Sequence, residues 1–212
     1  FYRGAIADVE EVRKLPSLPG TAQELRAMAK YLGADDEMIY LREKATETQA
    51  KTLPLDNIKV VAFSTHGLIS GDITGLAEPA LVLTPPRKGT ATDDGLLTAS
   101  EVAQLQLDAN WVILSACNTA AGEKPGAEGL SGLAKAFFYA GARTLLVSHW
   151  PVWDDAAAAL TTEMFGAIKK NTSIGRAEAL RQSMLQLASS KTNSLYSHPI
   201  FWAPFVVVGE GE

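Results

Sequence analysis

The sequence is poor in the residues that form disulfides and metal sites, because its 212 residues include one cysteine, Cys117, and three histidines. A single thiol excludes an intrachain disulfide and a zinc site built from several cysteines. It also suits a reducing compartment, so we expect a cytoplasmic protein. The chain begins at Phe1 without an initiator Met or an apolar leader, and we expect it to be part of a longer polypeptide.

Positive charge is also scarce, since 19 Lys and Arg residues stand against 24 Asp and Glu residues, for a formal net charge of -5. This balance excludes the basic stripe of a nucleic-acid-binding protein and the polybasic anchor of a membrane-surface protein. No apolar run approaches the ~20 residues that a membrane-spanning helix needs. Hydrophobic residues nevertheless make up 47% of the chain, which excludes a disordered protein. We expect one domain over residues 1–212.

Short apolar runs alternate along the chain with amphipathic helical stretches. The runs cover residues 38–41, 58–63, 111–114, 144–148 and 205–208, and the helical stretches cover 21–32, 100–107, 129–140, 155–169 and 176–188. Runs without polar alternation are typical of strands buried on both faces of a parallel sheet. The pattern therefore predicts an α/β domain with a mostly parallel sheet and helices on both faces.

Capping residues and loop composition place the boundaries of these elements. Thr21 with Glu24 and Thr98 with Glu101 have the spacing of capping boxes, and Gly141 is placed to end the helix before it. Two further stretches have the composition of loops, and the first has room for a hairpin that ends at 80–83. These loops cover residues 71–98 and 189–198.

Chemically versatile residues follow three of the predicted strands. His66 comes after run 58–63, Cys117 comes after run 111–114, and Trp150 with Asp154 comes after run 144–148. Parallel sheets bind ligands beyond the carboxyl ends of their strands, so we expect these side chains to share one cleft.

A histidine and a cysteine at neighbouring strand ends indicate nucleophilic catalysis. Taken alone, Cys117 is typical of a buried small hydrophobe, and His66 is typical of a capping or core residue. Together they supply a thiolate and a group that titrates near neutral pH, which is what covalent hydrolysis requires. Gly67 next to His66 would let a backbone N–H approach a substrate carbonyl.

Three motifs in this order and spacing resemble the CHAT domain family, the caspase-like cysteine peptidases that are related to separases and often attached to tetratricopeptide repeats. The motifs are Ser64-Thr65-His66-Gly67, Ser115-Ala116-Cys117-Asn118-Thr119 and Ser148-His149-Trp150-Pro151-Val152. Residues 94–98, 141–143 and 198–205 also fit the family pattern, so the resemblance runs over about 15–209. It implies a caspase-like fold, a regulatory repeat region elsewhere in the polypeptide, and a catalytic dyad of His66 and Cys117.

The resemblance implies peptide hydrolysis through an acyl-enzyme. Cys117 would attack the scissile carbonyl, and the backbone N–H groups of Gly67 and Cys117 would hold the oxyanion. His66 would protonate the leaving amine and then activate water. No cofactor is implied, and the sequence has no phosphate-binding glycine loop after a strand.

Substrate contacts are also carried over from the resemblance. Ser148, His149 and Trp150 would offer their backbone to an extended peptide. Asp154 lies about where separases place an acid that receives a P1 arginine, although an N-cap of helix 155–169 explains it equally well. Ser115 would also line the site. It stands where metacaspases carry an acid, so that half of a basic pocket is absent.

Other functions remain open or are excluded by particular residues. A catalytically silent caspase-like scaffold and a flavodoxin-like small-molecule binder stay as alternatives. Glu123 occupies the arginine position of a tyrosine-phosphatase loop, and Leu133 breaks the only near match to a serine-hydrolase elbow. No metal site is predicted, although the acids of 35–37 keep a divalent cation open. Segment 122–126 is either a flexible loop or a cleavage segment.

Overall fold

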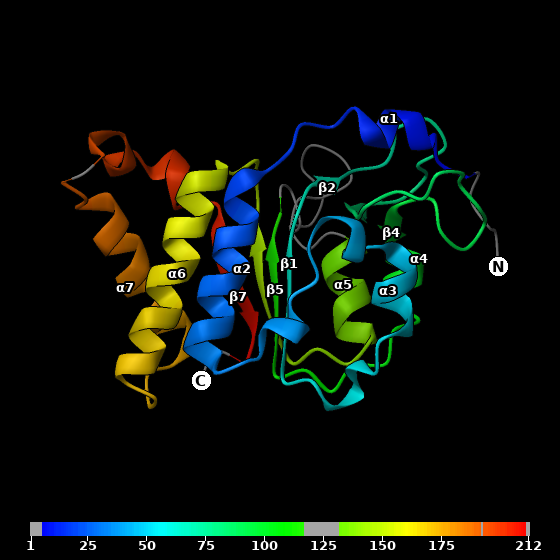
Figure 1. Ribbon diagram of the computed structural model, residues 1–212. Coiled ribbons are helices and arrows are strands. Elements are labelled where there is room, and N and C mark those ends of the chain that lie inside the picture. The colour runs from blue at the N-terminus through cyan, green and yellow to red at the C-terminus, as the bar shows by residue number, and fades with distance from the viewer. Residues whose placement is uncertain (1–5, 117–131, 192, 211–212) are drawn as a thin grey trace.

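The structure, a computed structural model, describes residues 6–116, 132–191 and 193–210 (Figure 1). The helices are α1 (Val9–Arg13), α2 (Pro19–Leu32), α3 (Glu47–Thr52), α4 (Ala99–Val102), α5 (Gly132–Tyr139), α6 (Asp154–Lys170) and α7 (Arg176–Ala188). The strands are β1 (Val60–Ser64), β2 (Gly67–Leu68), β3 (Ala80–Val82), β4 (Leu96–Thr98), β5 (Trp111–Ser115), β6 (Thr144–Ser148) and β7 (Phe205–Gly209). Short 3-10 helices cover Asp36–Met38, Arg42–Lys44, Leu55–Asn57, Ser194–Ser197 and Pro199–Phe201.

The main sheet has four strands in the order β1-β5-β6-β7. β1, β5 and β6 run parallel, and β7 runs antiparallel beside β6. Every residue of β5 and β6 is buried, as expected for interior strands covered on both faces. The predicted mostly parallel α/β fold is therefore confirmed.

Helices cover the two faces of this sheet, and alternate strand residues point to each. Trp111, Ile113 and Leu146 pack with α2, α6 and α7 on one face. Val112 and Leu145 pack on the other face, where α5 contributes Leu133 and Phe137. Figure 1 shows α2, α6 and α7 on one side of the strands and α3, α4 and α5 on the other. We call these sides the α6 face and the α5 face.

A second sheet lies at the carboxyl end of β1. β2, β3 and β4 form an antiparallel sheet in that order, with Ala80, Val82 and Leu96 in its own small core. The strand expected at 80–83 exists as β3, but it is the middle strand of this sheet. It pairs with β2, which precedes the loop 71–98, and with β4, so it is not the end of a hairpin within that loop. Since β2 begins three residues after β1 ends, the chain passes from one sheet to the other at residues 65–66.

The short helix α3 is tied to the turn before β4 by a buried carboxylate. Glu47 Oε2 accepts hydrogen bonds from the backbone N–H groups of Asp94 at 2.8 Å and Gly95 at 3.0 Å, and Glu47 Oε1 pairs with Lys51. Burial outweighs these contacts and raises the pKa of Glu47 to about 7. The contacts place α3 against the loop that leads into the small sheet.

Several sequence-based boundaries are confirmed and others are wrong. The capping box of Thr98 and Glu101 is present, and Gly141 follows α5 with a φ of 112°. Run 38–41 is not a strand, and the helix expected over 100–107 is the single turn α4. Helices α1 and α3 were not predicted, because short amphipathic turns carry little periodicity.

The Thr21–Glu24 capping box is also wrong. α2 begins at Pro19, so its N-cap is Leu18 and Glu24 lies inside the helix. Proline fits the first helical turn because its missing N–H is not needed there. Of the helices that the structure describes, none combines the length and the apolar composition needed to cross a membrane.

Gly141 tests the junction between α5 and β6. A Cβ at this position would lie 2.1 Å from the carbonyl oxygen of Leu107, and the φ of 112° disfavours side chains. We expect Gly141→Ala to lower the free energy of unfolding by more than ~2 kcal/mol. Gly33→Ala is the matched control, because its φ is also positive, at 71°, but no atom lies within 4 Å of its Cβ. Equal losses in urea unfolding would contradict the steric explanation.

Candidate active site

The three parallel strands all end on serine. Ser64 of β1 pairs with Ser115 of β5, and Ser148 ends β6 at the same edge. Strand alternation puts these serines on the α6 face, because Ala62, Ile113 and Leu146 two residues earlier pack there. A small polar layer therefore caps the apolar core at the carboxyl edge of the sheet.

The backbone around His66 is held between the two sheets. The Thr65 N–H donates to the Ser115 carbonyl at 3.3 Å, and the Val82 N–H donates to the His66 carbonyl at 2.9 Å. Thr65 is hydrogen-bonded to β5, and His66 is hydrogen-bonded to β3. Both sheets therefore fix the backbone that carries the half-buried imidazole.

The imidazole itself is oriented by a backbone carbonyl. His66 Nε2 lies 2.7 Å from the carbonyl oxygen of Pro16, in the segment between α1 and α2. A carbonyl oxygen only accepts hydrogen bonds, so Nε2 carries the proton and Nδ1 of the neutral ring is the acceptor. The sequence did not identify Pro16 as a site residue, because every residue has a main-chain carbonyl and the residue type therefore does not reveal this contact.

Gly67 presents its N–H away from the small sheet. Gly67 pairs with Leu81, and the Val82-to-His66 bond flanks that pair. In an antiparallel ladder this pattern marks a non-hydrogen-bonded pair, whose own N–H groups point outward. The Gly67 N–H, the predicted oxyanion donor, therefore points away from β3 and lies next to His66 in the chain.

Cys117, the predicted nucleophile and second oxyanion donor, lies outside the described residues. The chain is described as far as Ala116, which is buried directly after β5. Ser148 Oγ donates to the Ala116 carbonyl at 2.6 Å, so the end of β5 is fastened to the end of β6. The strand that precedes the cysteine therefore ends beside the strand that precedes His66.

The predicted substrate-binding residues differ in their exposure. Ser115 and Ser148 have buried side chains, whereas Trp150 is 38% exposed and His149 is exposed. The His149 N–H already donates to the Pro204 carbonyl at 3.0 Å. Since β6 is also paired on both sides, free backbone for a peptide would begin after His149.

Asp154 binds the beginning of another helix. It is the first residue of α6, and its Oδ2 accepts a hydrogen bond from the Gly20 N–H at 2.7 Å. A Cβ on Gly20 would lie 2.7 Å from the same oxygen, so a larger residue there would displace the Asp154 carboxylate. The alternative prediction, that Asp154 is the N-cap of its own helix, is wrong because Trp153 occupies that position. The carboxylate instead complements the N-terminus of α2.

Glu24 is a second carboxylate at this edge, and it is 1% exposed. Its Oε1 accepts a hydrogen bond from Thr161 Oγ1 at 2.7 Å. Burial raises the pKa of Glu24 above its ordinary value, and the charge of Asp154 adds to the rise, while the hydroxyls of Thr161, Ser64 and Ser115 oppose it. An acidic pair thus lies behind the serine layer.

Sequence reasoning assigned Glu24 to a cap, although its spacing contained a better signal. Met28 and Tyr31 follow it by four and seven residues, and both pack into the α6-face core. Residues at this spacing share one helix face, so Glu24 belongs to the buried face of α2. A carboxylate at such a position indicates a polar partner inside the fold.

The burial of Glu24 predicts a pH-dependent stability. The folded chain binds the Glu24 proton more tightly than the unfolded chain, so this group's contribution is full below about pH 4.5 and is lost as the pH rises through the raised pKa. Glu24→Gln removes the dependence, so the variant should gain stability relative to the wild type between about pH 5 and about pH 8. Urea unfolding at about pH 5 and about pH 8 measures the difference in the free energy of unfolding between variant and wild type. Glu37→Gln is the control, because Glu37 is exposed. A pH-independent difference would contradict the assignment.

Comparison with known proteins agrees with this architecture. A family model for the CHAT domain matches residues 6–210. Tetratricopeptide repeat protein 28 of Mus musculus is 34% identical over 118 residues, and the protein of the same name from Homo sapiens is 37% identical over 114 residues. Each match covers 54% of this chain and 4% of the relative, so the chain corresponds to a small part of these proteins. With its caspase-like α/β sheet and a family match over nearly its whole length, the chain belongs to the CHAT domain family.

Proposed function

We propose that this domain is a cysteine endopeptidase that cleaves a specific protein substrate with His66 and Cys117. The observation that carries the proposal is the hydrogen bond between His66 Nε2 and the Pro16 carbonyl at 2.7 Å. A nucleophile and its base are recognised by a third group that orients the base. Pro16 fills that role and leaves Nδ1 free to exchange protons.

The chemistry follows the order of an acyl-enzyme mechanism. The Cys117 thiolate attacks the scissile carbonyl and forms a C–S bond, while the imidazolium of His66 gives its proton to the leaving amine. The neutral imidazole then takes a proton from water, whose oxygen attacks the thioester carbonyl. The product acid leaves, and the thiolate and imidazolium are restored.

Oxyanion stabilisation comes from backbone donors in this proposal. The outward-pointing Gly67 N–H is one donor, and the Cys117 N–H is the second. Because Gly67 has no side chain, a peptide carbonyl can approach its N–H closely. Removing one such donor typically costs about 100–1000-fold in turnover.

Substrate recognition uses the edge after β6 in our proposal, where exposed Trp150 forms a wall and Ser115, Ser148 and His149 support it. A basic P1 residue is favoured by two carboxylates behind the serine layer, Asp154 and Glu24. A P1 cation would add a partner for Asp154 beyond the Gly20 N–H. It would also favour ionised Glu24.

Regulation is proposed from the relatives, which are named as tetratricopeptide repeat proteins. Such a region elsewhere in the polypeptide would present the substrate or gate the site, which suits a thiol peptidase working in a reducing compartment such as the cytoplasm. A catalytically silent scaffold is the competing function, and the dyad variants below discriminate between the two.

The dyad is tested with Cys117→Ala and His66→Ala. Each change should lower cleavage of a genuine protein substrate by at least ~1000-fold, because dyad members act as a unit. Cleavage and labelling by an acyloxymethyl ketone are measured in the full-length polypeptide. His198→Ala is the control, because that histidine accepts from the Ile200 N–H in a surface turn. Cleavage that survives both dyad changes would reject the mechanism, and failure of the wild type to react with any probe would favour the scaffold.

The acidic pocket is tested with Asp154→Asn. This change keeps an acceptor for the Gly20 N–H and removes the charge, so we expect the preference for Arg or Lys at P1 to fall by roughly 10-fold. A peptide library measures kcat/KM at P1. Asp155→Asn is the matched control, because the neighbouring carboxylate accepts instead from the Tyr196 hydroxyl at 2.9 Å. An unchanged P1 profile would contradict the pocket.

A further inference from the structure

The Pro16 carbonyl that orients the imidazole of His66 lies in a short connection between two helices. Residues 14–18 lead from the end of α1 at Arg13 to the start of α2 at Pro19. Proline fixes its own φ and restricts the residue before it, so Pro16 and Pro19 leave this connection little freedom. A displacement of α1 would therefore move the Pro16 carbonyl, and the imidazole would lose its acceptor.

Helix α1 is fastened to the loop between β2 and β3 by a carboxylate. Glu11 accepts two hydrogen bonds from Thr74, one from its N–H at 2.8 Å and one from its hydroxyl at 3.2 Å. The Thr74 carbonyl accepts in turn from the Asp8 N–H at 3.2 Å, at the N-cap of the helix. Hydrogen bonds to an ionised acceptor are stronger than those to a neutral one, so Glu11 supplies a strong link between α1 and this loop.

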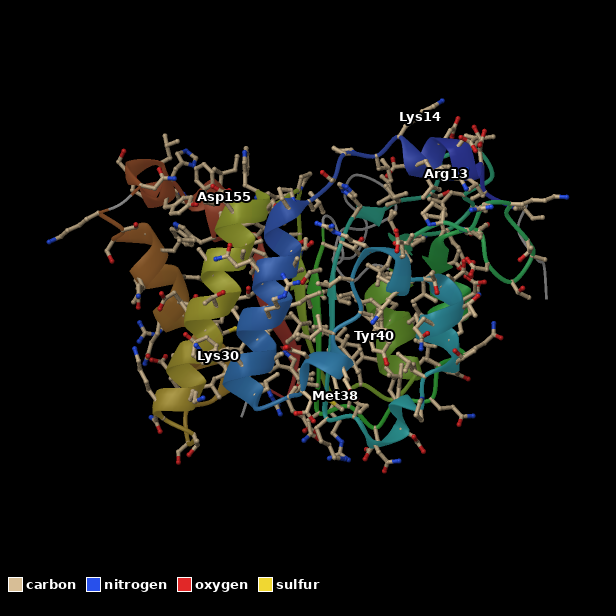
Figure 2. The ribbon with its side chains drawn as sticks, in the orientation of Figure 1. Arg13, Lys14, Lys30, Met38, Tyr40 and Asp155 are labelled. Atoms are coloured by element: carbon tan, nitrogen blue, oxygen red, sulfur yellow. The ribbon has the colours of Figure 1, made fainter. Side chains whose placement is uncertain are left out.

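The other contacts of α1 are made with the same part of the molecule. Val12 is 3% exposed and packs into the apolar core of the small sheet. Arg13 donates to the Pro86 carbonyl, and Figure 2 shows Lys14 after it pointing out into solvent. Apolar burial is non-directional, so the exact position of α1 on the sheet depends on its polar contacts.

The loop that receives Glu11 is itself held in place. The Gly71 N–H donates to the Leu76 carbonyl at 3.0 Å, which closes the loop around Thr74. Gly75 has a φ of 90°, and a Cβ there would lie 2.9 Å from the carbonyl oxygen of Ile6. The loop thus approaches the residues before α1 closely and gives Glu11 a fixed partner.

The small sheet therefore carries both halves of the hydrogen bond between His66 and Pro16. His66 directly precedes β2, and its carbonyl accepts from the Val82 N–H at 2.9 Å. Pro16 is connected to the same sheet through α1 and through Thr74, in the loop that follows β2. The ring reaches the sheet along the chain, whereas the carbonyl reaches it through contacts of α1 such as that of Glu11.

We propose that Glu11 is a positioning residue for His66. Its carboxylate holds α1 on Thr74, and α1 with residues 14–18 holds the Pro16 carbonyl on Nε2 of the imidazole. Without this link the imidazole loses its fixed orientation, because fewer contacts oppose rotation about its side-chain bonds. The effect on the ring does not depend on peptidase activity, whereas its consequence for turnover rests on the proposed function.

Exchange of the His66 Nε2 proton with water tests the positioning directly. The chain has three histidines, so NMR of the whole chain with labelled histidine gives few ring signals, and His66→Gln identifies the relevant one. In Glu11→Ala the proton should exchange at least ~10-fold faster than in the wild type, because opening of the hydrogen bond exposes it. Glu10→Ala should keep the wild-type rate, since this neighbouring acid pairs with Arg13 of the same helix.

Glu11→Gln separates the hydrogen bonds from the charge. Its amide oxygen accepts from the Thr74 N–H and its amide nitrogen donates to the Thr74 hydroxyl, so we expect the wild-type exchange rate. The amide of Val112 in β5 reports global opening and should exchange equally in all variants. An unchanged rate in Glu11→Ala, equal acceleration in Glu11→Gln, or equal acceleration at Val112 would overturn the proposal. A wild-type ring proton that exchanges too fast to be seen would also overturn it.

Turnover separates this proposal from the proposed function. With a cleaved protein substrate, Glu11→Ala should lower kcat by roughly 10-fold, because the base is less well oriented. KM should stay unchanged and Glu11→Gln should restore kcat, since Glu11 binds Thr74 rather than a residue of the proposed substrate edge. Full kcat in Glu11→Ala would overturn the positioning role. If the wild type cleaves nothing while the ring proton responds as expected, the positioning stands and the peptidase proposal fails.

Discussion

The parallel alignment of β1, β5 and β6 is the constraint on which the rest of the molecule depends. Their ladders bring Ser64, Ser115 and Ser148 to one edge and place the residues that follow them next to one another. Three chain segments separated by tens of residues thereby converge at one edge of the sheet. Interior burial of β5 and β6 makes this alignment costly to shift, because a one-residue slip would turn every apolar side chain to the wrong face.

Helix α2 connects the features described above. Its N-terminus is bound by Asp154, its buried face carries Glu24, and the segment that leads into it supplies the Pro16 carbonyl for His66. A displacement of α2 would therefore alter both the orientation of the imidazole and the acidic pair.

Burial of the Glu24 carboxylate at this edge of the sheet costs solvation free energy. Glu24 gives up solvation and is only partly compensated by hydroxyl donors, which is why its pKa rises. Asp154 sits beside it and is held by a single backbone donor among the described contacts. Uncompensated polar groups concentrate where a protein binds something, since stability alone would favour apolar residues there. Their place next to the strand ends supports the proposal that they belong to the candidate site.

The sequence by itself determined the class of fold and the edge of the sheet that carries the chemistry. Unbroken apolar runs specify interior strands, and strand direction then dictates that the strand before His66 and the strand before Cys117 end side by side, at Ser64 and Ser115. Their motifs also pointed to the family that the comparison identifies. The catalytic roles of His66 and Cys117 stay predictions.

Only the tertiary structure decided the partners of the side chains. Pro16 acts through a carbonyl that every residue possesses, and Glu24 and Asp154 meet residues more than a hundred positions away. Ile39 and Leu41 have strand-forming side chains and extended backbone, but they join no ladder within the described part of the chain. Local propensity specifies what a segment is able to form, whereas a strand exists only when a second strand completes its hydrogen bonds, and that depends on chain brought in from elsewhere.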